Sequence, residues 1–256
     1  MRNLKNKTVF ITGASSGIGM ASAKAFAKLG SNLIICARRL DRIKKLSEEL
    51  KKKHKIKIYA FKLDVRDYNE VKDKISKIPA EFKKIDILIN NAGLSRGLTK
   101  FQDGVLMDWE EMLDTNVKGL LYVSKEVIAL MLKNKSGHII NIGSIAGHEV
   151  YPMGNVYCAS KFAVDAITKG MRMDLIDTPI KVSTVDPGLV ETEFSLVRFR
   201  GDSKRANSVY TGIRPLYAEE IADAIEYIAT RDNDVVVAEM IMFPKIQAGT
   251  MVVNRK

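Results

Sequence analysis

Cysteine and histidine are scarce in this sequence, and their positions exclude two kinds of site. The two cysteines, Cys36 and Cys158, lie far apart and form no C-x-x-C pair, so neither a disulfide framework nor a thiolate metal site is indicated. The three histidines, His54, His138 and His148, lack the paired helical spacing of a zinc site. We therefore predict no structural metal.

Long apolar runs are also missing. No run approaches the roughly 20 apolar residues that a membrane-spanning helix needs, and the opening segment MRNLKNKTVFITG carries charges without the apolar stretch of a secretory signal. We expect a cytoplasmic protein that does not enter a membrane. Its 256 residues, 46% of them hydrophobic, suffice for a single α/β domain over residues 1–256.

Acidic residues are outnumbered by basic ones, which leaves a formal net charge of +11. A charge of this sign could serve nucleic-acid binding. The lysines, however, are spread along helical stretches, interleaved with acids and without an aromatic stacking platform. A solvated helix face is therefore the better interpretation, although the charge can still attract an anionic ligand.

Apolar runs bounded by turn residues alternate with amphipathic stretches along the chain. The amphipathic stretches, such as 19–30, 40–53, 108–134 and 157–177, are typical of helices. This alternation predicts parallel strands joined by right-handed crossovers, hence a Rossmann-type doubly wound α/β sheet with helices on both faces. The expected strands are 8–12, 32–37, 57–65, 86–93, 137–144, 181–187 and 235–243.

The glycine-rich segment TGASSGIG, residues 12–19, follows the first expected strand, where open α/β sheets bind ligands. Gly13 would allow a tight turn, Gly17 would let a pyrophosphate approach the backbone, and Gly19 would let the helix pack closely on the strand. The helix N-terminus adds N–H groups and positive potential for phosphates. An ordinary helix-entry loop is the alternative. The dinucleotide contacts predicted here are Gly13, Ser15, Ser16, Gly17, Ile18 and Gly19.

Two arginines, Arg38 and Arg39, follow the second expected strand. Proteins that bind NAD usually place an acid there, but this chain has Ala37. A guanidinium pairs with the 2'-phosphate of NADP, which an acid would repel, so we predict NADP rather than NAD. The alternatives are that the arginines begin a surface helix and that Asp41, one turn on, reaches the ribose of NAD.

Tyr157 and Lys161 lie four residues apart in an expected helix, thirteen residues after Ser144. Residues at this spacing share one helix face, so both side chains can point into one cleft. A free tyrosine titrates near pH ~10, and a cation about 4 Å away at an effective dielectric of roughly 20 favours the phenolate by up to about 4 kcal/mol. The pair therefore predicts a tuned proton donor, although a solvated tyrosine beside a surface lysine has the same spacing.

Taken together, these motifs resemble those of the short-chain dehydrogenases/reductases over essentially the whole chain. The family patterns TGxxxGxG, NNAG and YxxxK are matched by residues 12–19, 90–93 and 157–161, in this order. The resemblance implies an NADP-dependent oxidoreductase with the catalytic residues Asn116, Ser144, Tyr157 and Lys161.

The resemblance also implies a role for each catalytic residue. Tyr157 would protonate the carbonyl oxygen in reduction or deprotonate the alcohol in oxidation, and Ser144 would hydrogen-bond the same oxygen. Lys161 would lower the pKa of Tyr157 and bind the nicotinamide ribose, and Asn116 would hold a water that passes protons to it. Turn capping is the alternative for Asp64 and Asn91. The remaining cofactor contacts implied are Asp64, Val65, Asn91, Ala92, Gly93, Pro187, Gly188, Val190 and Thr192.

The segment 188–256 resembles the subgroup of NADP-dependent 3-hydroxy acid dehydrogenases and serine 3-dehydrogenases. This resemblance implies a small hydroxy acid substrate such as L-serine or L-allo-threonine. The long irregular stretch at about 189–215 predicts a lid. A substrate carboxylate needs a cation. Arg96, Arg198 and Arg200 are the candidates, and surface charge is their alternative role. Arg96 departs from the small or apolar residue expected at its position, which bears on substrate choice.

Other functions and the assembly remain open from the sequence. A broad NADPH-dependent carbonyl reductase for bulkier aldehydes, ketones or acyl thioesters is the main alternative. A non-catalytic NADP-binding regulator and a nucleic-acid-binding protein are weaker ones, because the catalytic set is intact and the basic charge is dispersed. The expected helices 104–133 and 157–177 carry apolar residues on more than one face, which in this family predicts a homotetramer with isologous interfaces.

Overall fold

A seven-stranded parallel sheet forms the centre of the structure, a computed structural model that describes residues 4–255. Residues 1–3 and 256 of the expected domain lie outside the described residues. All neighbouring strands are parallel, as the alternation of strands and helices predicted. In spatial order the strands are β3 (Ile58–Lys62), β2 (Asn32–Ala37), β1 (Thr8–Thr12), β4 (Ile87–Asn90), β5 (Gly137–Ile142), β6 (Ile180–Pro187) and β9 (Glu239–Met242).

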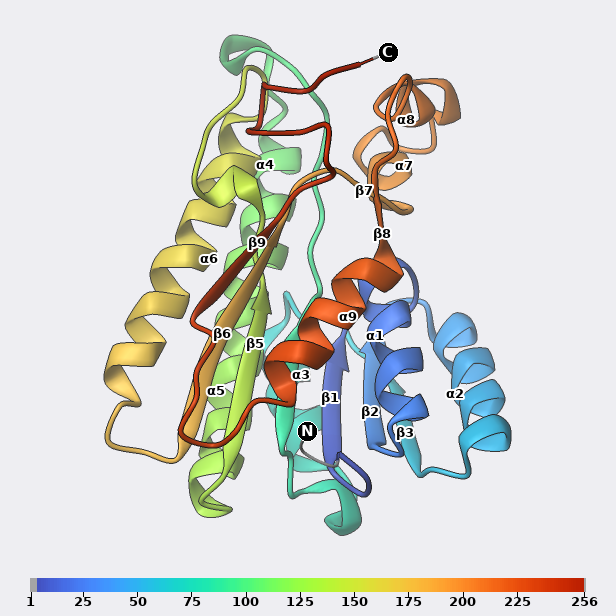
Figure 1. Cartoon of the computed structure of the whole chain (residues 1–256), viewed down its shortest axis with the longest axis vertical. Helices are drawn as coiled ribbons and strands as arrows, with labels where there is room; N and C mark the ends of the chain where they lie inside the picture. Colours follow the sequence, from blue (N-terminus) through green and yellow to red (C-terminus); the bar gives the residue numbers. More distant parts are fainter. Residues whose placement is uncertain (1–3, 256) are drawn as a thin grey trace.

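Helices cover both faces of this sheet (Figure 1). Three of them, α1 (Gly17–Lys28), α2 (Leu40–His54) and α9 (Ala218–Ala229), pack on one face. The other face carries α3 (Tyr68–Ser76), α5 (Gly119–Lys133) and α6 (Asn155–Asp174). The predicted doubly wound α/β class is therefore confirmed.

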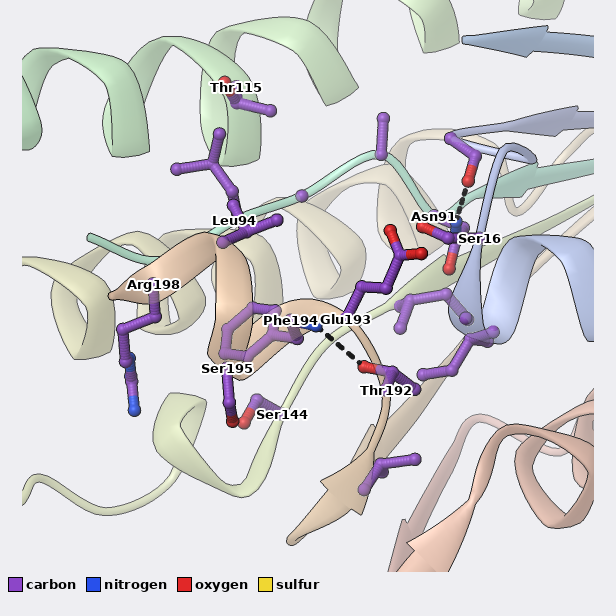
Figure 2. Close-up of a pocket in the computed structure, with 18 of the residues that line it drawn as sticks. Ser16, Asn91, Leu94, Thr115, Ser144, Thr192, Glu193, Phe194, Ser195 and Arg198 are labelled. Atoms are coloured by element: carbon purple, nitrogen blue, oxygen red, sulfur yellow. Dashed lines mark hydrogen bonds between the residues drawn. The ribbon is translucent and has the colours of Figure 1, made fainter. Parts of the chain in front are cut away.

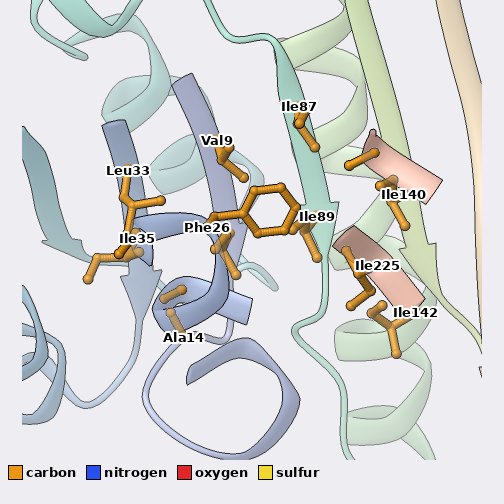
Figure 3. Close-up of a cluster of buried hydrophobic side chains, with 14 of the residues drawn as sticks. Val9, Ala14, Phe26, Leu33, Ile35, Ile87, Ile89, Ile140, Ile142 and Ile225 are labelled. Atoms are coloured by element: carbon orange, nitrogen blue, oxygen red, sulfur yellow. The ribbon is translucent and has the colours of Figure 1, made fainter. Parts of the chain in front are cut away.

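Burial on both faces explains why the strands are apolar at nearly every position. Successive side chains of a strand point to opposite faces, so Val9 and Ile11 join one core while Phe10 joins the other. In the first core Phe26 of α1 and Ile225 of α9 pack against the sheet (Figure 3). Each such side chain contributes about 1.5–3 kcal/mol when fully buried.

The stretch expected as one helix over 104–133 is interrupted. It consists of α4 (Leu106–Leu113), a π-helical turn η3 (Asp114–Lys118) and then α5. Wide turns of this kind are frequent at functional sites, and this one contains Asn116. No helix in residues 4–255 is long and apolar enough to cross a membrane.

The segment expected as a lid has secondary structure of its own. It contains β7 (Val190–Glu191), α7 (Phe194–Arg198) and α8 (Ser203–Ser208), and β7 pairs in parallel with β8 (Leu216–Tyr217). Figure 1 shows α7 and α8 beyond the upper ends of the central strands. Three short 3-10 turns complete the described elements: η1 (Ala80–Phe82), η2 (Phe101–Asp103) and η4 (Ile145–Gly147).

Candidate active site

A cavity of about 720 Å³ opens at the carboxyl ends of the strands, between the sheet and the α7 segment (Figure 2). This volume is within the usual range for cofactor and small-molecule sites. Of the residues predicted from the sequence, only Gly19 and Asn116 do not line it. The predicted residues that do are Gly13, Ser15, Ser16, Gly17, Ile18, Arg38, Arg39, Asp64, Val65, Asn91, Ala92, Gly93, Arg96, Ser144, Tyr157, Lys161, Pro187, Gly188, Val190, Thr192, Arg198 and Arg200.

The glycine-rich turn has the shape that its sequence predicted. Gly13 and Gly17 have φ angles of +67° and +52°, a region that favours glycine. A Cβ on Gly19 would lie 2.6 Å from the carbonyl oxygen of Gly13 and 2.4 Å from Asn91 Nδ2, so this glycine permits close packing beneath the turn. Helix α1 begins at Gly17, and its N-terminal end faces the cavity with the positive potential that binds phosphates.

The two predicted cofactor arginines point to different places. Arg39 donates to Ser15 Oγ at 3.0 Å and to Ser16 Oγ at 2.7 Å, so its guanidinium lies on the glycine-rich turn. Arg38 extends towards Glu111, 3.5 Å away. Arg39 is therefore the arginine placed for a phosphate near this turn.

An acid from the α7 segment occupies the same corner of the cavity. Glu193 accepts hydrogen bonds from Arg39 at 2.7 Å and from Arg42 at 2.7 and 2.9 Å. Burial alone would raise the pKa of the Glu193 carboxyl, but these guanidinium contacts outweigh it and lower the pKa. The carboxylate thus stays ionised beside the cations that the sequence assigned to the cofactor.

Asp64 caps its own turn, whereas Asn91 makes a long-range contact. Arg66 pairs with both carboxylate oxygens of Asp64, and its backbone N–H donates to Oδ1 at 3.1 Å. Asn91 donates from Nδ2 to the carbonyl of Thr12 at 2.9 Å, which ties the fourth strand's loop to the glycine-rich turn. Both residues still line the cavity, and Val65 lines it as well while also packing in the core.

Tyr157 and Ser144 meet at the deep end of the cavity, where a hydrogen bond from Ser144 favours the ionised phenol. Burial dominates, however, and with Tyr151 it raises the pKa of the Tyr157 phenol above its usual range, against the effects of Arg198 and Ser144. This direction is opposite to the one predicted from the sequence. Arg198 is a cation that acts to lower the pKa of this phenol.

Lys161 lies one turn along α6 from Tyr157 and points to a neighbouring strand. Its Nζ donates to the carbonyl of Ile142 at 2.8 Å. Burial lowers the pKa of Lys161 to about 8, and Asp186 partly opposes the shift. An ammonium held in this way is a group that can exchange protons near neutral pH.

Asn116 lies behind the cavity wall. Its side chain accepts from the backbone N–H of Leu94 at 2.8 Å and donates to the carbonyl of Leu94 at 2.8 Å and to Ser160 Oγ at 3.0 Å. The amide therefore fixes the chain directly after the NNAG segment. This contact explains why a buried asparagine, 2% exposed, is needed at the π-helical turn.

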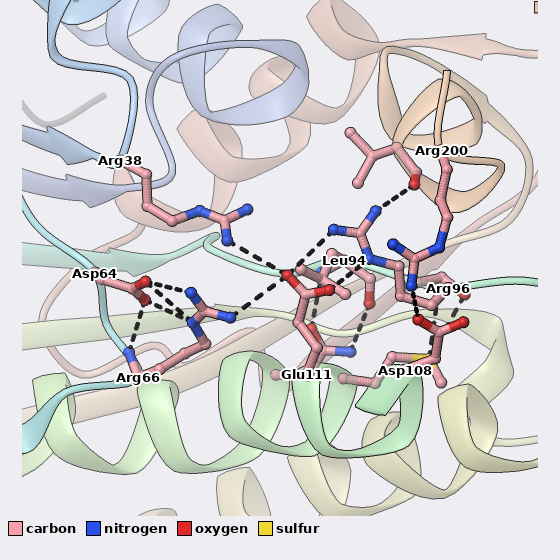
Figure 4. Close-up of polar contacts among 12 residues, drawn as sticks. Arg38, Asp64, Arg66, Leu94, Arg96, Asp108, Glu111 and Arg200 are labelled. Carbon is pink, nitrogen blue, oxygen red and sulfur yellow. Dashed lines mark hydrogen bonds and ion pairs between the residues drawn. The ribbon is translucent and has the colours of Figure 1, made fainter. Parts of the chain in front are cut away.

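The three arginines proposed to bind a substrate carboxylate differ in their partners, and Figure 4 shows those of Arg96 and Arg200. Arg96 forms hydrogen bonds of 2.6 and 3.1 Å to Glu111 and a third of 2.6 Å to the carbonyl of Val197. Arg200 pairs with Asp108 at the surface. Both cations are already paired, and Arg96 serves to join α4 to α7.

Arg198, the third of these arginines, contacts uncharged partners. Its guanidinium donates to Ser95 Oγ at 2.9 Å and to the hydroxyl of Tyr151 at 2.5 Å, and it lies 5.2 Å from the ring centroid of Tyr157. Within residues 4–255 no carboxylate lies within ion-pairing distance of it. The structure therefore places one cation without an acidic partner beside the predicted proton donor.

Several residues of the site were missed by sequence reasoning. Glu193 directly follows the predicted contact Thr192, but an acid is not expected beside a phosphate site. Ser95 and Tyr151 come from loops whose positions no periodic pattern reveals. The missed residues are Arg42, Ser95, Glu111, Tyr151 and Glu193.

The family described as short chain dehydrogenase matches residues 7–201. The chain belongs to this family. Its similarity to curated relatives extends over nearly its whole length: it is 43% identical to an "NADP-dependent 3-hydroxy acid dehydrogenase" of Schizosaccharomyces pombe, over 100% of this chain and 99% of that protein. It is also 41% identical to "Sulfoacetaldehyde reductase 2" of Chromohalobacter salexigens, over 94% and 95% of the two chains.

This short-chain dehydrogenase also has similar solved structures. One is described as the closed form of serine dehydrogenase complexed with NADP+; it superposes with a TM-score of 0.91 at 37% identity and covers 97% of this chain and 100% of that one. The predicted family and the prediction of an oxidoreductase are thus confirmed.

Proposed function

We propose that this short-chain dehydrogenase uses NADP to oxidise the 3-hydroxyl group of small hydroxy acids such as L-serine or L-allo-threonine, or to reduce the corresponding 3-oxo compounds. The observation that carries the proposal is Arg198, a cation without an acidic partner that lies over the ring of Tyr157. A guanidinium binds a carboxylate through two parallel hydrogen bonds. The names of the relatives support the same substrate class.

The residues of the cavity fit the proposed cofactor. The turn at Gly13 and Gly17 exposes backbone N–H groups at the start of α1, and Arg39 adds a guanidinium where NADP carries its additional phosphate. When bound, NADP accepts or supplies the hydride. The relative from Schizosaccharomyces pombe is named as NADP-dependent, in agreement with this assignment.

Three side chains of the protein act on the substrate. In oxidation the phenol oxygen of Tyr157 accepts the proton of the substrate hydroxyl, and in reduction it returns that proton to the carbonyl oxygen. Ser144 donates a hydrogen bond to the same oxygen. Because burial keeps the Tyr157 phenol protonated at neutral pH, the site is better prepared for reduction, and oxidation should gain from a higher pH. Arg198 holds the substrate acid so that its hydroxyl faces Tyr157.

An aldehyde that carries a sulfonate is the second candidate substrate. A guanidinium pairs with a sulfonate much as it does with a carboxylate, and one relative is named as a sulfoacetaldehyde reductase. Bulkier uncharged carbonyl compounds, which the sequence left open, make no use of Arg198. Sulfoacetaldehyde and a neutral aldehyde therefore belong in the same assay.

The test compares charged and neutral substrates in purified wild-type protein, Arg198→Ala and Arg198→Lys, with Arg200→Ala as the matched surface control. NADPH absorbance is followed with L-serine, L-allo-threonine and 3-hydroxyisobutyrate, with sulfoacetaldehyde, and with a neutral aldehyde. Loss of charge-assisted hydrogen bonds worth about 1.5–3 kcal/mol predicts a KM for the acids that is roughly 10- to 150-fold higher in Arg198→Ala. The lysine variant should recover only part of this loss, because it lacks the planar fork.

Equal losses on acids and on the neutral aldehyde would show that Arg198 only packs against Tyr157. Turnover of the neutral aldehyde alone would favour the broad carbonyl reductase. NADPH binding without any turnover, in wild type as in Tyr157→Phe, would favour the regulator.

The proposal also includes a homotetrameric assembly, a substrate lid and a cytoplasmic location. Leu121, Phe162 and Met173 are 42%, 41% and 73% exposed on α5 and α6, which supports pairing of these helices between subunits in a homotetramer. The segment 189–215 carries Arg198 and Glu193, which supports its role as a substrate lid. Mass measurement in solution tests the tetramer, hydrogen exchange with and without NADP tests the lid, and cell fractionation tests the cytoplasmic location expected from the sequence.

A further inference from the structure

A cluster of three potential metal ligands lies behind the catalytic serine, on elements distant in the sequence. His148 follows the turn η4, Asp186 is near the end of β6, and Glu239 opens the edge strand β9. The register pairs Glu239 with Thr184, two residues before Asp186, so both carboxylates project from the same face of the sheet. The sequence predicted no metal because its histidines are unpaired, but this cluster uses only one of them.

The ligand atoms of the cluster have the separations of a metal site. His148 Nε2 lies 3.1 Å from Glu239 Oε1 and 3.7 Å from Asp186 Oδ2, and the three ligand atoms lie within 4.8 Å of one another. Two ligands bound tetrahedrally to zinc at about 2.0–2.1 Å are roughly 3.4 Å apart. The two distances to the imidazole nitrogen lie on either side of this value.

Two of these atoms lack hydrogen-bond partners. Asp186 is 2% exposed, and its Oδ2 has no hydrogen-bond partner within the described part of the chain. His148 Nε2 has none either, although Glu239 is near, because the geometry is not that of a hydrogen bond. A protonated imidazole would be expected to donate to one of the carboxylates. Polar atoms that face one another in a buried cluster without a hydrogen bond between them instead suit a cation.

We propose that His148, Asp186 and Glu239 form a binding site for Zn²⁺. One imidazole nitrogen and two carboxylate oxygens are a common ligand type for this ion, whereas Mg²⁺ and Ca²⁺ prefer oxygen ligands alone. The side chains of His148 and Glu239 are 20% and 30% exposed, so the cluster lies next to the protein surface. A water would complete the four ligands that Zn²⁺ usually binds.

The charges around the cluster are compatible with a bound cation. Lys169 of α6 is paired with Asp165 at 2.8 Å, and Nζ of Lys161 is directed at the carbonyl of Ile142. Neither ammonium forms an ion pair with the two carboxylates of the cluster within the described residues. A divalent ion would neutralise these carboxylates, one of which is almost fully buried.

The site is connected to the catalytic residues by Asp186. While Oδ2 faces the cluster, Oδ1 accepts a hydrogen bond from the backbone N–H of Ser144 at 3.1 Å and another from Thr184 Oγ1 at 3.2 Å. A bound ion would therefore fix the carboxylate that holds the Ser144 backbone and would join the ends of β6 and β9. We expect it to stabilise the fold around Ser144 rather than to take part in hydride transfer.

The experiment titrates Zn²⁺ into full-length protein that has been freed of metal with a chelator, and measures the binding isotherm and the thermal midpoint. Substitution with Co²⁺ reports the ligand geometry through its visible spectrum. His148→Gln and Glu239→Gln remove one ligand each, and His54→Gln is the control for binding by an unrelated histidine. Because Glu239 is partly exposed, its variant keeps the test informative if His148→Gln folds poorly.

The site predicts one Zn²⁺ per chain, a rise in the thermal midpoint of wild type, and affinity that is weaker by at least about tenfold in both ligand variants but unchanged in His54→Gln. Absence of binding to wild type, or equal affinity in wild type and both ligand variants, would overturn the proposal. The result does not depend on the substrate, so it stands apart from the test of the proposed function.

Discussion

Replacing Glu193 by glutamine should strengthen the binding of NADPH while leaving NADH almost unaffected. In the structure Glu193 pairs with Arg39 and Arg42, the cations nearest the glycine-rich turn. The side chains involved are 38–45% exposed, so each ion pair is worth about 0.2–1 kcal/mol. A 2'-phosphate must compete with this carboxylate for the same guanidinium groups. Removing both pairs should therefore lower the Kd of NADPH by roughly 2- to 30-fold.

The assay is fluorescence or calorimetric titration of both reduced dinucleotides at low and high salt. NADH has no 2'-phosphate, so its Kd is the internal control, and Glu191→Gln is a matched change at an exposed acid two residues away. The gain for NADPH should shrink as salt screens the charges. An equal change in the Kd of both dinucleotides would refute the reasoning. Weaker NADPH binding in Glu193→Gln would refute it as well, and would mean that Glu193 holds Arg39 in position for the phosphate.

Three further predictions follow from the site and the core. Tyr157→Phe should lower kcat by roughly 10²- to 10⁴-fold while the Kd of NADPH stays within a small factor, as measured by turnover and titration on the same sample. Burial lowers the pKa of His138 to about 3 in the folded protein. Its contribution to the free energy of unfolding is therefore fully present above the unfolded pKa of about 6.5, and it is lost as the pH falls towards 3. Urea unfolding should show about 1.6 kcal/mol less loss between pH 6.5 and 5 in His138→Gln than in wild type, and an equal pH dependence in both would contradict the assignment. Arg96→Leu should destabilise the folded protein by about 1–3 kcal/mol because it leaves Glu111 partly unpaired. The control Arg200→Ala should destabilise it by less than about 0.5 kcal/mol. Similar thermal midpoints for both variants would argue against a structural role for Arg96.

Much of the site could be predicted because it depends on local sequence. The turn at Gly13 and Gly17 needs positive φ angles that glycine supplies, and its position between a strand and a helix is visible in the apolar pattern. Tyr157 and Lys161 share a helix face by their spacing alone. The contact of Lys161 with Ile142 could not be predicted in this way, because it depends on how α6 packs on β5.

The different roles of the three arginines could not be predicted from the sequence. In the sequence, Arg96 follows the NNAG segment and Arg198 and Arg200 lie in the expected lid, and no local pattern distinguishes their roles. The structure separates them by their partners: Glu111 and Asp108 neutralise two of them, and the third lies over Tyr157. Those acids are 15 and 92 residues away from their arginines along the chain, and nothing in the local pattern links them.

The sequence by itself determined the doubly wound sheet, the glycine-rich turn between its first strand and helix, and the shared helix face of Tyr157 and Lys161, because hydrophobic period, glycine conformation and helical spacing act over a few residues. Only the tertiary structure decided the electrostatics of the site. Burial raised the pKa of the Tyr157 phenol where a nearby charge was expected to lower it, and long-range packing brought Glu193 to Arg39 and His148 to Asp186. Desolvation and ion pairing depend on which atoms surround a group in space, and that is fixed only when distant segments pack together.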